Sequence, residues 1–363
     1  MSLKKNDEIK LNIESVTSEG SALGRYNGLA VFVFGAVPGD VVEAHIIKVS
    51  KNYAVGIIKE IIEKSPFRIE SDCPVSDKCG GCTFRSMTYE KELQSKLDFV
   101  NGNMERIAKL PIRCEEIIGA SDILRYRNKA QYPVCIQGNG FCAGFYAYKS
   151  HRIVPAADCL LQPAEFKAGV EAFEKWALAA NVSSFDEKSG RGLLRHIYFR
   201  KAFATGEIMA CAVINGSSVP EPQMLVSFLQ SALPGLKSVV LNINKNKTNV
   251  ILGEKTKLLW GSEKITDMLL GKKFIISPQS FYQVNHAQCE KLYSAAAELA
   301  GLSGSETVLD MYCGAGTVGI SLSDKCKSLC GIEIVPQAVE NAIENARLNN
   351  LSSAEFICAD AYE

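Results

Sequence analysis

The sequence lacks any long apolar run. Runs such as Leu29 to Phe34 are far too short to span a bilayer, and the charged start MSLKKNDEIK has no apolar core of a signal peptide. These absences exclude a membrane-spanning protein and a secreted one. The sequence therefore predicts a cytoplasmic protein with no membrane partner.

The chain also lacks net charge, since its 40 basic and 40 acidic residues cancel. This balance argues against a polybasic tail, although a neutral total can hide local patches. Two stretches, 121–152 and 188–201, are rich in Lys and Arg, with Asp122 as their one acidic residue. No internal repeat or low-complexity tract appears. At 363 residues the chain is long enough for two or three domains.

Cysteine, in contrast, is abundant, with thirteen in the chain. In the cytoplasm thiols stay reduced, so closely spaced cysteines indicate a metal site or a catalytic thiol more than a disulfide framework. The stretch CPVSDKCGGC places Cys73, Cys79 and Cys82 together. We expect eight others to be ordinary core residues, because free cysteine behaves as a small hydrophobe: Cys114, Cys135, Cys142, Cys211, Cys289, Cys326, Cys330 and Cys358.

The pattern of apolar residues predicts several domains. Short β-branched runs broken by Gly, Pro, Asn and Asp over residues 8–62 indicate a small five-stranded barrel of the OB type. Helical spacing marks residues 90–109, and residues 120–270 alternate strand-like runs with one clear helix at 164–180, typical of an α+β domain. From about residue 303 the order strand, Gly-rich turn, helix, strand, helix, strand is the first half of a doubly wound parallel sheet.

A glycine-rich loop opens this last region. Gly314-Ala315-Gly316-Thr317-Val318-Gly319 fits G-x-G-x-x-G directly after a strand, and Glu333 closes the next strand, where an acid can accept the hydroxyls of a ribose. The pattern predicts a nucleoside cofactor without choosing between NAD and S-adenosylmethionine. Asp310 favours S-adenosylmethionine, because an acid before the loop can meet a cationic amino-acid group but would repel a pyrophosphate.

Taken in order, the barrel, C-x5-C-x2-C, YRNKAQYPV, HRIVPAADC, GLLRH, ISPQSFYQVN and LDMYCGAGTVG resemble the bacterial RNA 5-methyluridine methyltransferases. They resemble in particular the branch with a TRAM barrel and an iron–sulfur cluster that modifies 23S ribosomal RNA. The resemblance implies a TRAM/OB-like barrel at 1–62, a central RNA-binding domain with the iron–sulfur loop at 63–270, and the Rossmann-like start of a methyltransferase domain at 271–363. The helix over 90–109 is a candidate to pack on the methyltransferase domain.

The resemblance also assigns site residues. Cys159 is implied as the fourth ligand of a [4Fe–4S] cluster with Cys73, Cys79 and Cys82, whereas spacing alone leaves zinc equally open. Gln283, Tyr312 and Glu333 match cofactor contacts of the family. General Rossmann logic adds Asp310, Gly314, Gly316 and Asp360, the last as a candidate partner of the adenine amino group, although it could simply cap its strand.

RNA contacts are predicted where basic and aromatic side chains alternate, because phosphates need neutralising and bases need stacking partners. The alternative for such residues is a solvated strand face. We interpret the four histidines, His45, His151, His196 and His286, as structural. The predicted RNA-binding residues are Arg125, Arg127, Lys129, Gln131 and Arg195.

The chemistry implied by the resemblance is methylation of uracil C5 by S-adenosylmethionine. A cysteine thiolate adds to C6, C5 attacks the methyl group, and a base removes the C5 proton. In the family the nucleophile and base follow the strand at 354–358, so we expect neither in this chain, predict an inactive fragment, and do not interpret Cys313 as catalytic. The alternatives are a noncatalytic iron–sulfur RNA-binding module, a transfer-RNA methyltransferase and, disfavoured by the cysteine spacing, a radical S-adenosylmethionine enzyme. We expect a monomer.

Overall fold

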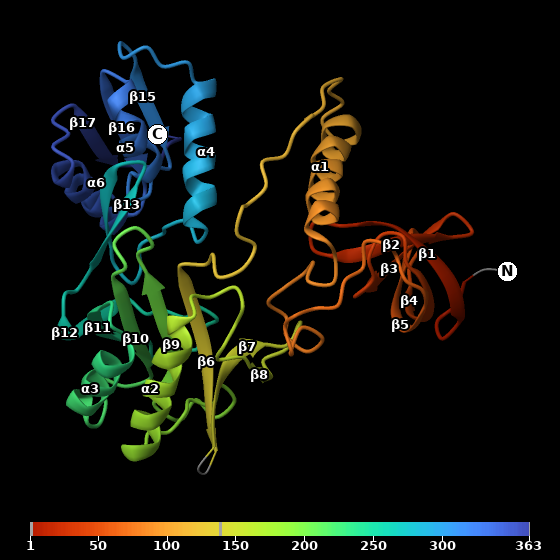
Figure 1. Ribbon diagram of the computed structural model, residues 1–363, viewed down its shortest axis with the longest axis horizontal. Coiled ribbons are helices and arrows are strands. Elements are labelled where there is room, and N and C mark those ends of the chain that lie inside the picture. Colours follow the sequence, from red (N-terminus) through yellow and green to blue (C-terminus); the bar gives the residue numbers. More distant parts are fainter. Residues whose placement is uncertain (1–2, 138–139, 363) are drawn as a thin grey trace. The chain divides into compact units, whose positions relative to one another are not determined.

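The computed structural model describes residues 3–137 and 140–362 (Figure 1). They form two compact units: unit 1 is Met1–Gly119 with Ala147–Ser150, and unit 2 is Ala120–Tyr146 with His151–Glu363. No helix among these residues is long and apolar enough to cross a membrane.

Unit 1 begins with a closed barrel of strand order β1-β2-β3-β5-β4. Its strands are β1 (Glu8–Val16), β2 (Ser21–Tyr26), β3 (Leu29–Phe34), β4 (Val41–Val49) and β5 (Tyr53–Glu63). Alternation along β1 turns Ile9, Leu11 and Ile13 into the barrel core, while the residues between them are exposed. The five-stranded barrel predicted from the sequence is confirmed.

A buried carboxylate, Asp40, fixes the turn between β3 and β4. It accepts hydrogen bonds from the N–H groups of Val37 (2.7 Å) and Ser65 (2.9 Å), and from Arg68 Nε (3.0 Å). Burial alone would raise the pKa of Asp40, but Arg68 and the two N–H groups hold it below its usual value. Asp40 thereby ties the chain that leaves β5 to the barrel.

After the barrel, the three clustered cysteines flank two consecutive turns, and helix α1 (Tyr89–Arg106) follows. The Thr88 hydroxyl caps α1 by accepting from Lys91 N. This is the helix predicted over 90–109, with an end three residues earlier, and it belongs to unit 1.

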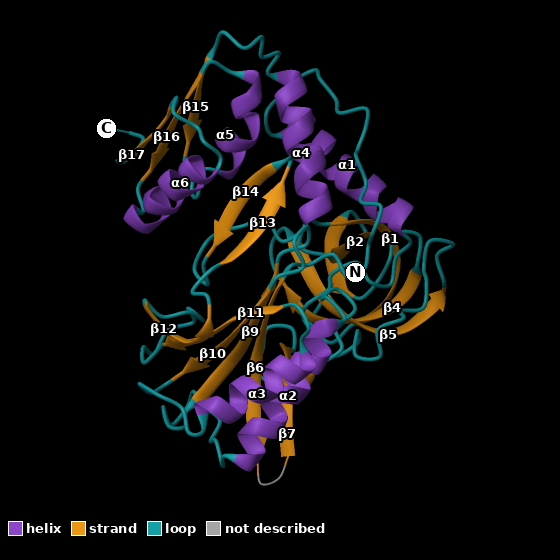
Figure 2. Cartoon of the chain, turned by 60° about the vertical axis from the view of Figure 1, so that its left-hand side comes forward, coloured by secondary structure: helices purple, strands orange, loops and turns teal. Residues whose placement is uncertain are grey.

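Unit 2 is built on a seven-stranded sheet of order β12-β11-β10-β9-β6-β7-β8 (Figure 2). The strands are β6 (Lys129–Gln137), β7 (Gly140–Tyr146), β8 (Ile153–Pro155), β9 (Leu194–Lys201), β10 (Ile208–Ile214), β11 (Leu236–Ile243) and β12 (Lys255–Gly261). Every residue of β10 is buried, because helices α2 (Glu165–Ala179) and α3 (Pro222–Ala232) cover one face and the elements from β13 onward cover the other.

The second face of this sheet carries the hairpin β13 (Ile265–Leu269) and β14 (Lys272–Ile276), and helix α4 (His286–Leu299). A three-stranded parallel sheet follows, coloured blue in Figure 1, made of β15 (Thr307–Met311), β16 (Ser328–Glu333) and β17 (Ala354–Cys358). Its connections are α5 (Thr317–Leu322) with the short η1 (Ser323–Lys325), and α6 (Pro336–Leu348). The predicted start of a doubly wound sheet is confirmed.

Several local expectations were wrong. Residues 249–253, one of the strand-like runs expected within 120–270, are a series of bends, and β12 forms directly after them. Helices α3 and α4 were not predicted. Cys114 and Cys358 are exposed and only Cys211 and Cys289 among the eight ordinary cysteines are fully buried, because burial depends on which segment packs over a thiol and not on the thiol itself.

Candidate functional site

The glycine loop joins β15 to α5 with three backbone conformations in the left-handed region. These are Tyr312 (φ 63°), Gly314 (φ 55°) and Gly316 (φ 77°). A side chain at Gly316 would collide with Ile320 and Phe356, whereas nothing lies within 4 Å of a Cβ placed on Gly314. The side of the loop at Gly314 is therefore open, where a ligand can approach the backbone.

The two predicted acids hold this loop from opposite ends. Glu333, at the end of β16, accepts from Gly314 N (3.0 Å) and Val335 N (2.9 Å), one with each oxygen. Asp310, on β15, accepts from Gly319 N (2.9 Å), and burial raises the pKa of its carboxyl group. Each carboxylate oxygen can accept more than one hydrogen bond, so both acids retain acceptor capacity for a ligand.

The loop also rests on α6 and α4. Asn345 Nδ2 donates to the Ala315 carbonyl (3.0 Å), while Asn345 Oδ1 accepts from Ile275 N (2.8 Å) and so connects the loop to β14. The hydroxyls of Tyr293 and Thr317 lie 3.2 Å apart. These contacts fix the loop before any ligand binds, which lowers the entropic cost of binding.

The remaining predicted cofactor residues lie outside the loop. Asp360 is exposed and follows β17, whose Cys358 is the cross-strand partner of Glu333, so it lies at the carboxyl edge of the parallel sheet. Gln283 lies in the segment between β14 and α4, and its carbonyl accepts from Asn128 Nδ2 (2.7 Å). The cofactor roles of all seven residues stay predictions.

Cys313 lies in the loop but has the environment of a structural thiol. It is buried, with 6% of its surface exposed, and burial together with the nearby acids raises its pKa to about 12. A nucleophilic cysteine needs the opposite environment, because the thiolate is the reactive form. This environment is therefore unfavourable for a catalytic thiolate. The prediction that the chain is inactive gains no support from the structure and stays a prediction.

The predicted RNA-binding residues have different surroundings. Arg125 forms an ion pair with Asp158 (2.8 Å) and donates to the carbonyls of Cys159 and Gln162, so it holds the loop before α2. Arg195 is buried and donates to the carbonyls of Asn244 and Asn246, both at 2.9 Å. These partners give both arginines structural roles, and their RNA contacts stay predictions.

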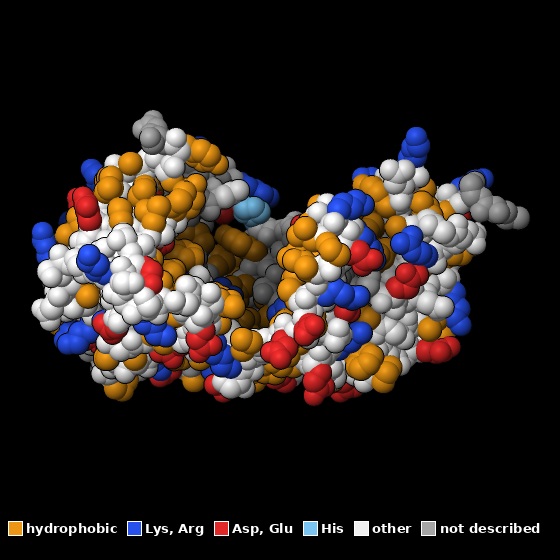
Figure 3. Space-filling model, turned by 90° about the horizontal axis from the view of Figure 1, so that it is seen from above, with side chains coloured by type: hydrophobic (Ala, Val, Ile, Leu, Met, Phe, Trp, Pro, Cys, Tyr) orange, Lys and Arg blue, Asp and Glu red, His pale blue; other side chains and the backbone are white. Residues whose placement is uncertain are grey.

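Three other predicted RNA contacts lie at or before β6. Ala130, Tyr132 and Val134 point to the face covered by α2, so alternation directs Lys129 and Gln131 to the opposite face. Arg127 precedes this strand and donates its N–H to the Leu161 carbonyl (3.0 Å). In the view of Figure 3, acidic and basic side chains are intermixed on the visible face.

The cysteine cluster is not confirmed. Across residues 3–137 and 140–362, no group of three or more Cys, His or acidic side chains is placed to hold a metal ion. Cys73, Cys79 and Cys82 belong to unit 1 and Cys159 to unit 2. Within the loop, Gly81 N–H donates to Cys79 Sγ (3.4 Å). The [4Fe–4S] cluster therefore stays a prediction from the resemblance.

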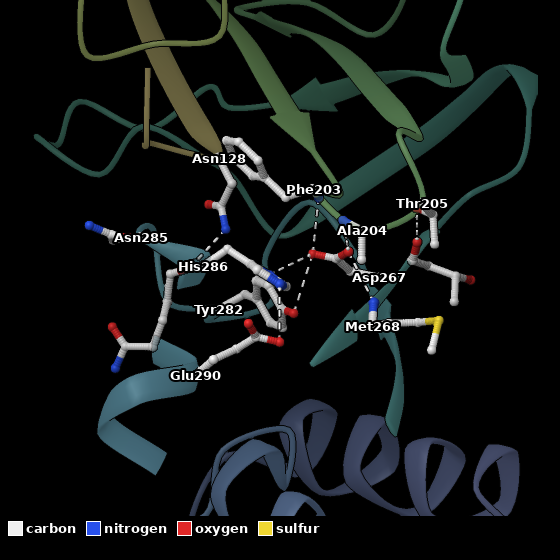
Figure 4. Close-up of polar contacts among 12 residues, drawn as sticks. Asn128, Phe203, Ala204, Thr205, Asp267, Met268, Tyr282, Asn285, His286 and Glu290 are labelled. Carbon is white, nitrogen blue, oxygen red and sulfur yellow. Dashed lines mark hydrogen bonds and ion pairs between the residues drawn. The ribbon is translucent and has the colours of Figure 1, made fainter. Parts of the chain in front are cut away.

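Sequence reasoning missed a buried polar cluster around Asp267 (Figure 4). Its carboxylate, with no exposed surface, accepts from the N–H groups of Ala204 (2.9 Å) and Met268 (3.0 Å). Tyr282 OH and His286 Nδ1 each lie 3.3 Å from Oδ2. The cluster connects the β9–β10 turn, the β13–β14 hairpin and the start of α4. No pattern in the sequence around His286, the first residue of α4, indicates that an acidic residue lies next to it.

The barrel, the fixed glycine loop and the two acids define a methyltransferase with an appended small β-barrel. Residues 3–59 match the TRAM domain family and residues 302–363 match a methyltransferase domain family. The chain is 41% identical over 360 residues to an uncharacterized RNA methyltransferase of Halalkalibacterium halodurans, covering 99% of this chain and 79% of that protein. It is 40% identical over 359 residues to another from Clostridium tetani, covering 99% and 78%.

Among solved structures, the fold is similar to that of the Pyrococcus abyssi tRNA (uracil-54, C5)-methyltransferase in complex with S-adenosyl-L-homocysteine. The TM-score is 0.76 with 24% identity, over 98% of this chain and 80% of that one. The chain belongs to the TRAM-domain RNA methyltransferases.

Proposed function

We propose that this RNA methyltransferase uses S-adenosylmethionine to methylate C5 of uracil in RNA. The observation that carries the proposal is the prearranged glycine loop, open at Gly314 and bordered by Glu333 and Asp310. The similar fold of a tRNA uracil-C5 methyltransferase that holds S-adenosyl-L-homocysteine supports the choice of base and cofactor.

Each part of the loop has a role in this proposal. Glu333, hydrogen-bonded to Gly314 N, would accept the ribose hydroxyls, and the open side of Gly314 would receive the sugar. Asp310 would face the cationic amino-acid group, since a cation offsets the burial that raises the pKa of Asp310. Tyr312, with 63% of its surface exposed, would cover the ligand from the loop.

The RNA substrate is 23S ribosomal RNA in this proposal, following the family branch that the sequence resembles. Transfer RNA is the second candidate, favoured by the substrate in the name of the structural neighbour. The [4Fe–4S] cluster on Cys73, Cys79, Cys82 and Cys159 remains part of the proposal as a group that helps to position RNA, with no role in the methyl transfer.

Product mapping tests the proposal. The protein is expressed in a host that lacks its own uracil-C5 methyltransferases, and ribosomal and transfer RNA are digested and searched for 5-methyluridine by mass spectrometry. We expect one or more 5-methyluridines in 23S ribosomal RNA, absent with Glu333→Ala. If 5-methyluridine appeared in transfer RNA alone, transfer RNA would replace 23S ribosomal RNA as the proposed substrate.

A calorimetric titration with S-adenosylhomocysteine separates the competing functions. Binding of this ligand without any 5-methyluridine would favour a noncatalytic RNA-binding module. Failure to bind it at all would contradict the assigned role of the glycine loop.

A further inference from the structure

Two cations face each other across neighbouring strands on one face of the central sheet. Lys129 of β6 and Arg200 of β9 are direct cross-strand partners, and alternation directs both toward the face covered by the elements after β12. Like charges in directly opposite positions repel and destabilise a sheet. Arg200 is largely withdrawn from water, with only 2% of its surface exposed, and Lys129 is half-buried.

Neither cation has an acidic partner. Across the described parts of the chain, no carboxylate oxygen lies within 4.0 Å of the charged nitrogens of Lys129, Arg200 or nearby Arg127. The next residue on β9, Lys201, points to the other face, where it forms an ion pair with Glu165 of α2 (2.5 Å). Its charge is therefore compensated, unlike those of Lys129 and Arg200. Burial, together with Arg200 and Arg127, lowers the pKa of Lys129, which is the expected consequence of uncompensated charge.

Arg200 is held in place by hydrogen bonds, but one of its donors has no partner within residues 3–137 and 140–362. Its Nη2 donates to the Ser280 carbonyl (2.9 Å), and its Nη1 lies 3.4 Å from the Ser277 carbonyl. Its Nε is buried with no hydrogen-bond partner among the described residues. Ser280 Oγ in turn lies 3.5 Å from Asn341 of α6, the helix that supports the glycine loop. The cations therefore adjoin the segment that leads to Gln283 and the cofactor half of unit 2.

We infer that Lys129 and Arg127, with Arg200 behind them as a positioning residue, form a binding site for one backbone phosphate of the RNA, next to the target uridine. This inference rests on the proposed function. A phosphate would supply the negative charge that no nearby carboxylate of the described chain supplies. The repulsion between the cations in the free protein would then be offset by their attraction to the phosphate. The cost in stability of the free protein is the mark of a site built for a ligand.

Stability and RNA binding should therefore change in opposite directions in Lys129→Gln. Removing this charge relieves the repulsion, so Tm should rise by about 1–3 °C. Affinity for a fluorescein-labelled uridine-rich hairpin RNA should fall about 8-fold at about 0.1 M KCl, and the slope of log K against log salt should become shallower by about 0.9. A lysine with a purely structural role would give a lower Tm instead.

Lys201→Gln is the matched control, since it also removes one lysine charge, at the position next to Arg200 on β9. It breaks the ion pair with Glu165, so Tm should not rise, and both the affinity and the salt slope should stay as in the wild-type protein. Arg127→Gln should reproduce the weaker RNA binding.

The outcomes separate this inference from the proposed function. If the wild-type protein binds the RNA and Lys129→Gln binds it equally well with the same slope, the phosphate site is overturned and the methyltransferase proposal stands. If the wild-type protein fails to bind any RNA, both fall. A fall in affinity with an unchanged salt slope would also reject a phosphate contact.

Discussion

Asp267 offers the sharpest test of the structure, because five donors converge on one buried carboxylate (Figure 4). Asp267→Ala leaves the N–H groups of Phe203 and Ala204, the Tyr282 hydroxyl and the His286 imidazole without this acceptor. A buried donor without a partner costs about 1–3 kcal/mol. Breaking a buried ion pair costs about 3–5 kcal/mol. We expect the free energy of unfolding of unit 2 to fall by about 4 kcal/mol.

Asp267→Asn is the conservative comparison. It keeps the shape and one carbonyl oxygen but loses the charge that faces His286, so we expect a loss of about 2 kcal/mol. The ordering of the two variants matters more than either value, because a cavity effect alone would leave the asparagine variant, whose side chain fills the same space, as stable as the wild type.

The assay is urea unfolding followed by tryptophan fluorescence. The chain has two tryptophans, and both report on unit 2: Trp176 is buried in α2 and Trp260 lies on β12 against the same core. The signal therefore does not include barrel unfolding. Equal midpoints for wild type and Asp267→Ala, with equal slopes, would refute the buried hub.

The pH dependence adds an independent check. The pKa of His286 is raised, chiefly by its hydrogen bond with Asp267, so its contribution is complete below about pH 6.5 and is lost as pH rises through the folded pKa. Burial raises the pKa of Asp267, but His286 and the N–H donors lower it overall, so its contribution is lost as pH falls through that lowered value. In Asp267→Asn, the loss of stability as the pH rises through the pKa of His286 should be smaller than in the wild-type protein.

Three further predictions concern other parts of the chain. Asp40→Asn should lower the stability of the barrel by about 2 kcal/mol near neutral pH, measured by hydrogen exchange of β1 amides, and the effect should shrink as the pH falls through the lowered pKa of Asp40. Glu333→Gln should weaken binding of S-adenosylhomocysteine about 10-fold or more in calorimetry, since the amide replaces one acceptor with a donor; unchanged binding would contradict its assigned role. Anaerobically purified protein should contain iron and acid-labile sulfide and lose both in Cys159→Ser, whereas stoichiometric zinc without sulfide would reject the cluster.

Sequence reasoning succeeded where the signal is local. The alternation of Ile9, Leu11 and Ile13 has the period of a strand, so it specified a half-buried barrel strand without knowledge of its neighbours. The glycine loop was predictable for a related reason: the positive φ angles at Gly314 and Gly316 are backbone requirements that few other residues meet. Helix α1 was predictable because its signals are also local: the helical spacing of its apolar residues and the Thr88 cap lie within one short segment.

By itself, then, the sequence determined the barrel, the glycine loop with Glu333 at the end of the next strand, and the family. Tertiary structure alone decided the rest. It showed that Arg195 is held by two main-chain carbonyls, that Lys129 faces Arg200, and that Asp267 gathers donors from three segments. The physical reason is that charge and hydrogen-bond partners depend on which strands pair and which faces pack. These contacts join residues far apart in the chain, so no local pattern contains them.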